Sequence, residues 1–155
     1  MAITQSLYAK GGEPLPYPSD AGAVVAKRFS FLMTPAILAA AGDIVELACI
    51  PVGCRPIDVI LDSDDLDTNG APTLTIDVGV MSGKFGDQAQ DRTCGNEFFA
   101  ASTVGQAGGV AHPTKKEAYR VPAASGERSI GLKIAAAAAT AAGGTVGLTV
   151  LLATE

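Results

Sequence analysis

Two apolar segments flank an acidic segment near the middle of this chain. They read Arg55-Pro-Ile-Asp-Val-Ile-Leu61, Asp62-Ser-Asp-Asp-Leu-Asp-Thr-Asn-Gly70 and Pro72-Thr-Leu-Thr-Ile-Asp-Val78. In the last segment apolar and polar residues alternate, which is the pattern of a strand with one buried face. Asp, Asn and Gly favour turns, because the polar side chains bond their own backbone and glycine accepts left-handed conformations. The order of strand, turn and strand predicts a corner of an all-β fold.

The same alternation recurs along most of the chain. We expect strands at residues 24–33, 43–50, 57–61, 73–80, 119–121, 129–136 and 145–152, a strand or helical turn at 97–103, and one helical turn at 37–41. The alanine-rich segment 135–144 favours helix by propensity, but it lacks a large apolar face, so we expect strand and loop there. Seven to eight short strands without a long helix predict a β-sandwich. Long connections, and the absence of any Trp, favour a jelly-roll-like topology over an immunoglobulin-like one.

The first residues differ from the rest of the chain. The segment Gly11-Gly-Glu-Pro-Leu-Pro-Tyr-Pro18 carries three prolines at alternate positions, which keep the backbone extended and prevent full pairing in a sheet. We therefore divide the chain into an extended arm, 1–23, and a β-sandwich domain, 24–155. The arm either dangles from the domain or docks on a neighbouring surface, with Leu15 and Tyr17 as anchors.

Composition and charge exclude several classes of protein. The chain has 155 residues, a net charge of −5 and only 17% charged residues. A net negative charge argues against nonspecific nucleic-acid binding, which requires a basic surface. No signal peptide and no membrane-spanning apolar run is recognisable. The low charge suggests a surface covered by other subunits, or a compact domain with a Ser, Thr and Gly surface.

The three cysteines do not predict a disulfide framework. They are Cys49, Cys54 and Cys94, an odd number in a chain without an export signal. The spacing of Cys49 and Cys54 fits no zinc pattern, and a second pair of ligands is missing. We expect buried free thiols.

The acidic segment resembles the start of a calcium loop. Asp65, Asp67 and Asn69 occupy the first, third and fifth positions of an EF-hand, but the twelfth position, which requires Glu, is Ile76. We reject an EF-hand for that reason. A looser calcium site formed by Asp62, Asp64 and Asp67 remains open, and so does the alternative that these residues only shape a turn.

No catalytic motif is present. The single histidine, His112, precedes a proline in an expected loop, and neither Ser102 nor Ser125 lies in a nucleophile elbow. The glycines at 105–109 lack the lysine and helix of a phosphate-binding loop. We predict that the chain is not an enzyme and holds no cofactor.

Three segments of the chain resemble a group of small structural proteins of tailed bacteriophages. They are Gly42-Asp-Ile-Val-Glu-Leu through Asp58-Val-Ile-Leu to Gly79, then Ser102-Thr-Val-Gly-Gln-Ala-Gly-Gly109, and finally Ile130-Gly-Leu-Lys-Ile to Val150. The resemblance covers roughly residues 24–153. It implies a head decoration (cement) protein or another minor virion component, with a β-rich domain that is often trimeric. It carries over no functional residue.

We therefore expect a virion structural protein, made in the host cytoplasm, whose partners are the major capsid protein and further copies of itself, as a homotrimer. Repeated modest contacts would strengthen the shell by avidity. We predict Leu15, Tyr17, Val104 and Val110 as interface residues. The alternatives are a minor tail or neck protein, a carbohydrate- or receptor-binding jelly roll, and, least supported, a small hydrolase.

Overall fold

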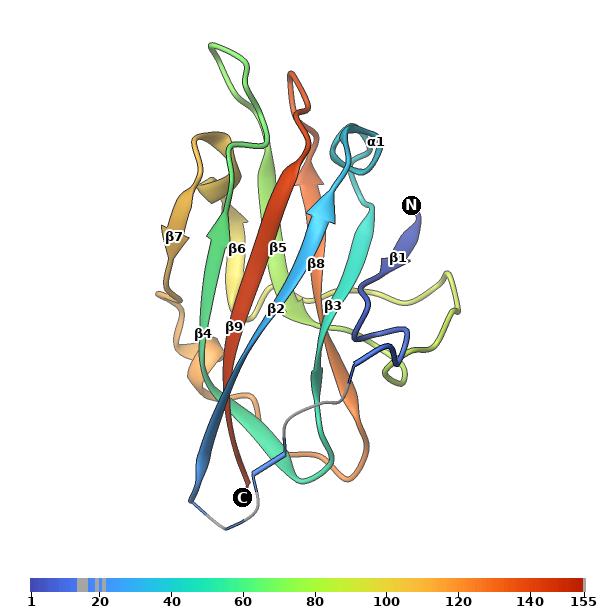
Figure 1. Ribbon diagram of the computed structural model, residues 1–155, viewed down its shortest axis with the longest axis vertical. Coiled ribbons are helices and arrows are strands. Elements are labelled where there is room, and N and C mark those ends of the chain that lie inside the picture. The colour runs from blue at the N-terminus through green and yellow to red at the C-terminus, as the bar shows by residue number, and fades with distance from the viewer. Residues whose placement is uncertain (14–16, 19, 21, 155) are drawn as a thin grey trace.

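The computed structural model describes residues 1–13, 17, 18, 20 and 22–154 (Figure 1). Two sheets lie face to face, one with the strand order β1-β3-β8-β5-β6 and the other with the order β2-β9-β4-β7. The strands are β1 (Ile3–Gln5), β2 (Val24–Met33), β3 (Ile44–Ile50), β4 (Cys54–Ser63), β5 (Thr75–Val80), β6 (Phe99–Ser102), β7 (Gly109–Ala111), β8 (Arg128–Ala136) and β9 (Gly144–Thr154). Short helical turns are α1 (Pro35–Leu38), η1 (Val104–Gln106) and η2 (Lys116–Tyr119).

The connectivity confirms the predicted jelly roll. Strands β2, β9, β4 and β7 form one sheet, and β3, β8, β5 and β6 form the other, so that consecutive strands from β2 to β5 alternate between the sheets. This arrangement of eight antiparallel strands is the double Greek key of jelly rolls. The ninth strand, β1, is additional and pairs in parallel with β3.

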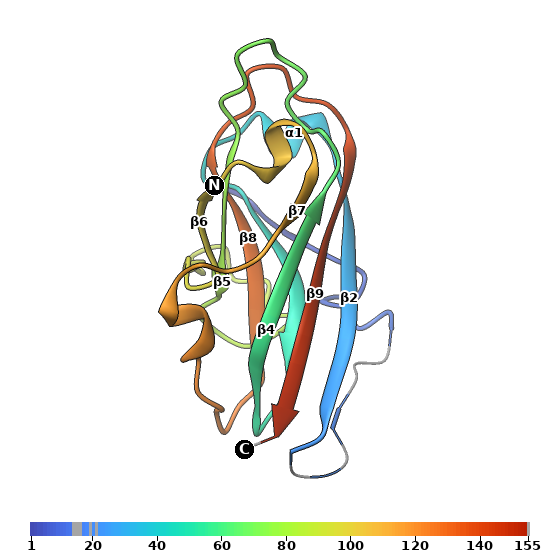
Figure 2. The ribbon, with the colours of Figure 1, turned by 90° about the vertical axis from the view of Figure 1, so that its left-hand side faces the viewer.

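The core lies between the two sheets (Figure 2). Its side chains come from alternate positions of the long strands, as the period-2 pattern requires. The buried members include Phe29, Met33, Leu61, Val146, Leu148 and Val150 from one sheet, and Val45, Leu47, Ile76, Val78, Ile130 and Leu132 from the other.

One predicted strand is wrong. Residues 119–121 do not form a strand, because the chain there ends the 3₁₀ turn η2 and continues as loop. Val121 is buried all the same, so the apolar signal reflected packing of a loop residue against the core and not strand pairing. The alanine-rich 135–144 segment contains strand and loop, as predicted.

Part of the predicted arm is ordered by pairing. Ile3, Thr4 and Gln5 align with Ile44, Val45 and Glu46 of β3. The division of the chain at residue 23 stays a prediction.

Candidate functional site

Asp67 organises the acidic corner between β4 and β5. Its carboxylate accepts backbone hydrogen bonds from Thr73 (2.7 Å), Leu74 (3.0 Å), Ala139 (3.0 Å) and Thr140 (2.8 Å). Burial alone would raise the pKa of this carboxyl, but the four amide donors outweigh burial and hold the pKa well below its usual range. Asp67 therefore fastens the β4–β5 corner to the connection between β8 and β9.

The other two carboxylates of the calcium hypothesis have separate partners. Asp62 pairs with Arg28 across the sheet at 2.5 Å, and Asp64 accepts a hydrogen bond from the N–H of Thr145 at 2.7 Å. Within the described residues, no group of three His, Cys, Asp or Glu side chains is placed to hold a metal ion. The carboxylates of this corner thus accept backbone hydrogen bonds or pair with an arginine. Calcium binding there stays a hypothesis.

Three of the four predicted interface residues lie in the described part of the chain, each in a different place. Tyr17 is 58% exposed, with its hydroxyl near Gly53 just before β4, and Val110 is 64% exposed on β7, where it pairs with Asp62 near the other end of β4. Val104 is half-buried in η1 and packs against the core. Leu15 lies outside the described residues. Tyr17 and Val110 thus offer apolar surface at different ends of the fold, and their interface role stays a prediction.

A buried ion pair is the largest polar feature that the sequence did not reveal. Glu46 and Arg92 are almost fully buried, and Arg92 Nη2 lies 2.8 Å from Glu46 Oε1. Glu46 also accepts hydrogen bonds from the Ser129 hydroxyl, the Gly86 N–H and the Gln5 amide. Burial would raise the pKa of Glu46, but the bond from Arg92 and the other donors hold it below its usual value.

Arg92 fastens a long connection onto the outer face of the β3-β8-β5 sheet. Its guanidinium donates to the carbonyls of Ser82 (2.8 Å) and Asp87 (2.7 Å) as well as to Glu46. We call residues 81–98 the covering loop, because Met81 and Cys94 of this segment lie against the strands beneath it. The ion pair therefore joins this loop to β3.

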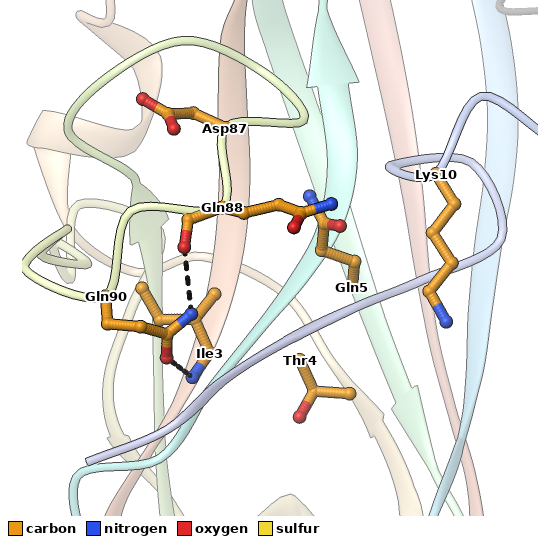
Figure 3. A pocket seen from close by; sticks show the side chains of 7 residues that line it. All are labelled: Ile3, Thr4, Gln5, Lys10, Asp87, Gln88 and Gln90. Atoms are coloured by element: carbon orange, nitrogen blue, oxygen red, sulfur yellow. Dashed lines mark hydrogen bonds between the residues drawn. The ribbon is translucent and has the colours of Figure 1, made fainter.

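A polar pocket of about 340 Å³ lies between β1 and the covering loop (Figure 3). Glutamine side chains dominate its wall, and Gln90 accepts a hydrogen bond from the N–H of Ile3 at 3.1 Å and donates one to the carbonyl of Gln88 at 3.0 Å. Gln90 thereby satisfies an amide of the short edge strand β1, which gives the pocket a structural reason to be polar.

Two of the residues considered for catalysis lie at one pocket. Ser102 and His112 border the same shallow pocket of about 290 Å³, but no hydrogen bond joins them in the part of the chain that the structure describes. The Ser102 hydroxyl accepts a bond from the N–H of Val104 within its own turn.

The three thiols are free, and two of them, Cys49 and Cys54, are buried. Burial raises the pKa of Cys49 to about 12, with smaller contributions from nearby carboxylates, and burial also raises the pKa of Cys94 to about 12. The thiolate is the reactive form, so both side chains are chemically quiet at neutral pH.

No helix in the described residues has the length and apolar character needed to span a membrane.

The fold and sequence are similar to those of phage capsid chains of known structure. A chain from the structure "Capsid of Ralstonia phage GP4" is 49% identical, with a TM-score of 0.91 and 99% of each chain covered. A chain from "Cyanophage Pam1 capsid asymmetric unit" is 28% identical, with a TM-score of 0.64 and coverage of 94% of this chain and 96% of that one. A chain from "Acidic stable capsid structure of Helicobacter pylori bacteriophage KHP30" shares the fold at 15% identity, with a TM-score of 0.54 and coverage of 86% and 90%. No family model and no curated protein matches the chain.

Proposed function

Because the chain belongs to the same family as a capsid chain of Ralstonia phage GP4 and is a virion component, we propose that it is a head decoration (cement) protein. It binds on the lattice of the major capsid protein and stabilises the head. Its role is structural and not catalytic.

The observation that carries the proposal is the likeness over 99% of the chain to a capsid chain, at 49% identity, in a chain with a net charge of −5. A shell subunit that lines the interior faces packaged nucleic acid, and a negatively charged chain is repelled by phosphates. A position on the outer surface of the head avoids that repulsion. The rigid two-sheet domain and the exposed side chains Tyr17 and Val110 suit a protein that acts through contacts.

Binding to many equivalent lattice positions turns weak contacts into a stabilised shell. We expect the protein to sit on the lattice as a homotrimer, so that each unit bridges several capsid subunits at once. The molar mass of the purified protein in solution and the number of copies bound per head test whether it is a trimer.

The test uses heads assembled without this protein. We expect the purified full chain to co-sediment with such heads and to raise the temperature at which they release nucleic acid. A Tyr17→Glu chain should bind less tightly, since it places a charge on a predicted contact. Leu7→Glu is the matched control, because Leu7 is 55% exposed, follows β1 in the chain and is not a predicted contact residue. Absence of binding together with unchanged heat resistance would remove the decoration role.

Labelling of intact virions checks the location. A labelled antibody against the chain should decorate the whole head. Label confined to the neck or tail would instead support a minor tail or neck protein.

A further inference from the structure

The β2-β9-β4-β7 sheet has one face that no other described segment covers. Figure 1 views the molecule from this side. We call this surface the open face. From β2 it presents Val24, Ala26, Arg28, Ser30 and Leu32; from β9 Thr145, Gly147, Thr149, Leu151 and Ala153; from β4 Arg55, Asp58, Ile60 and Asp62; and from β7 Val110.

Aliphatic side chains are exposed at the margins of the open face. Leu32 is 67% exposed, Val110 is 64% exposed and Val24 is 52% exposed. They make up three of the eight large hydrophobic side chains exposed among the described residues. Single exposed aliphatics are ordinary, but these three project from one face of one sheet, two from β2 and one from β7.

The centre of the open face is flat. The Arg28 Nε and Nη2 atoms reach across β9 to the two carboxylate oxygens of Asp62, at 3.0 and 2.5 Å. Gly147 lies beneath this pair, and a Cβ at that position would overlap both charged groups. Because Gly147 has no side chain, the Arg28–Asp62 ion pair lies close against the sheet. A second flat surface can therefore approach this part of the open face closely.

The open face is also electrically neutral, unlike the rest of the molecule. Its charged side chains are Arg28, Arg55, Asp58 and Asp62, two positive and two negative, whereas the whole chain has 11 basic and 16 acidic residues, a net charge of −5. Two copies of the chain repel each other through their remaining surfaces, where the whole excess of negative charge lies. They meet without net repulsion through this face, and opposite charges can alternate across the contact.

We propose that a second copy of this chain packs on the open face, sheet against sheet. Such a contact is twofold and self-complementary: the aliphatic margin of each copy covers the other, and the Arg28–Asp62 pairs become shielded from water. The contact joins two copies directly, or joins neighbouring trimers across a twofold axis of the shell. It does not depend on the decoration role, since it requires only the chain itself.

The experiment measures the mass of the purified full chain by light scattering over a range of concentrations. We expect the unchanged chain to form assemblies that the Leu32→Glu chain does not form, with the mass falling by a factor of two or more. Leu7→Glu introduces the same charge at an exposed leucine off the open face and should leave the mass unchanged. Val110→Glu, at the opposite margin, should act as Leu32→Glu does, so that one misfolded variant cannot decide the result.

Circular dichroism confirms that each variant retains its strands. A monomeric unchanged chain at high micromolar concentration would overturn the proposal. So would an assembly whose mass is insensitive to both Leu32→Glu and Val110→Glu.

Discussion

The two sheets of this jelly roll are built from similar strands but differ in what lies outside them. In the sheet that contains β3, β8 and β5, all seven residues of β3 are buried, because the covering loop packs on the outer face. In the sheet that contains β2, β9 and β4, outward residues such as Leu32 and Arg28 are exposed. The sheet that contains β3, β8 and β5 is therefore buried on both faces. The sheet that contains β2, β9 and β4 is buried on one face and exposed on the other.

The two ion pairs show the same difference. Glu46–Arg92 is buried beneath the covering loop, and Arg28–Asp62 lies on the open face with side chains 47% and 31% exposed. A buried charge that loses its partner is costly, whereas an exposed pair is screened by water and ions. The covered sheet should therefore determine the stability of the fold, and the open sheet should determine its contacts.

Replacement of an arginine in each pair gives the largest expected contrast. Arg92→Ala leaves Glu46 buried without its cation and should lower the free energy of unfolding by about 3–5 kcal/mol. Arg28→Ala should cost about 0–1 kcal/mol. Urea denaturation of dilute protein measures both, and equal losses would show that the two sheets do not differ in this way.

Two outward-facing glycines provide a second contrast. A Cβ at Gly79 in the covered sheet would overlap the backbone of Gly95 and Asn96, which cannot move aside without shifting the covering loop. We expect Gly79→Ala to lower the free energy of unfolding by about 1–3 kcal/mol. Gly147→Ala displaces only the mobile ends of Arg28 and Asp62, so its cost should stay near about 1 kcal/mol or less. Thermal unfolding of the two variants shows which of them loses more stability. A larger loss of stability for Gly147→Ala than for Gly79→Ala would contradict the comparison.

Acid should lower the stability of the fold by protonating carboxylates that accept hydrogen bonds in the folded protein. The pKa values of Glu46 and Asp67 are lowered in the folded protein, so each contributes stability that is complete above the unfolded pKa of about 4 and is lost as the pH falls toward the folded pKa. We expect the unfolding free energy to be level from about pH 7 to 5 and to fall below about pH 4. Asp67→Asn should be less stable at neutral pH and lose less on acidification. An unchanged acid slope in this variant would show that its four amide bonds do not control the pH dependence.

Substitution on the open face should give the smallest change in stability. Leu32→Ala removes an exposed side chain that supports no core contact, so the free energy of unfolding of dilute protein should change by no more than about 0.5 kcal/mol. Leu132→Ala in the core of the covered sheet serves as the reference, with an expected loss of about 2–5 kcal/mol.

The strands with clear alternation could be predicted from the sequence. Residues 24–33, 129–136 and 145–152 correspond to β2, β8 and β9, because a long strand with one core face shows its period directly. Strands β1 and β7 were missed, since three residues are too few to show a period and their pairing depends on distant strands. The nine strands of the described residues thus include two that local pattern could not reveal.

The Glu46–Arg92 pair could not be predicted for a related reason. Glu46 stands among apolar residues in a predicted strand, and that isolated charge was the one available signal of a buried partner. Its partner lies in a glycine-rich connection without periodicity, so nothing local indicated that Arg92 would be buried. Only part of the role of Asp67 could be predicted. The turn was predicted from its residue types, but the amides of Ala139 and Thr140 that Asp67 binds lie far from it in the sequence.

The position of β9 has a consequence for synthesis of the protein. β9 lies between β2 and β4, and both of these strands are made long before residues 144–154. A nascent chain on the ribosome therefore holds β2 and β4 without the strand that joins them, and their hydrogen-bonding edges remain unsatisfied until translation has passed β9. Non-local topologies of this kind fold on the order of milliseconds to seconds, and here that step cannot begin until residues 144–154 are available to pair with β2 and β4.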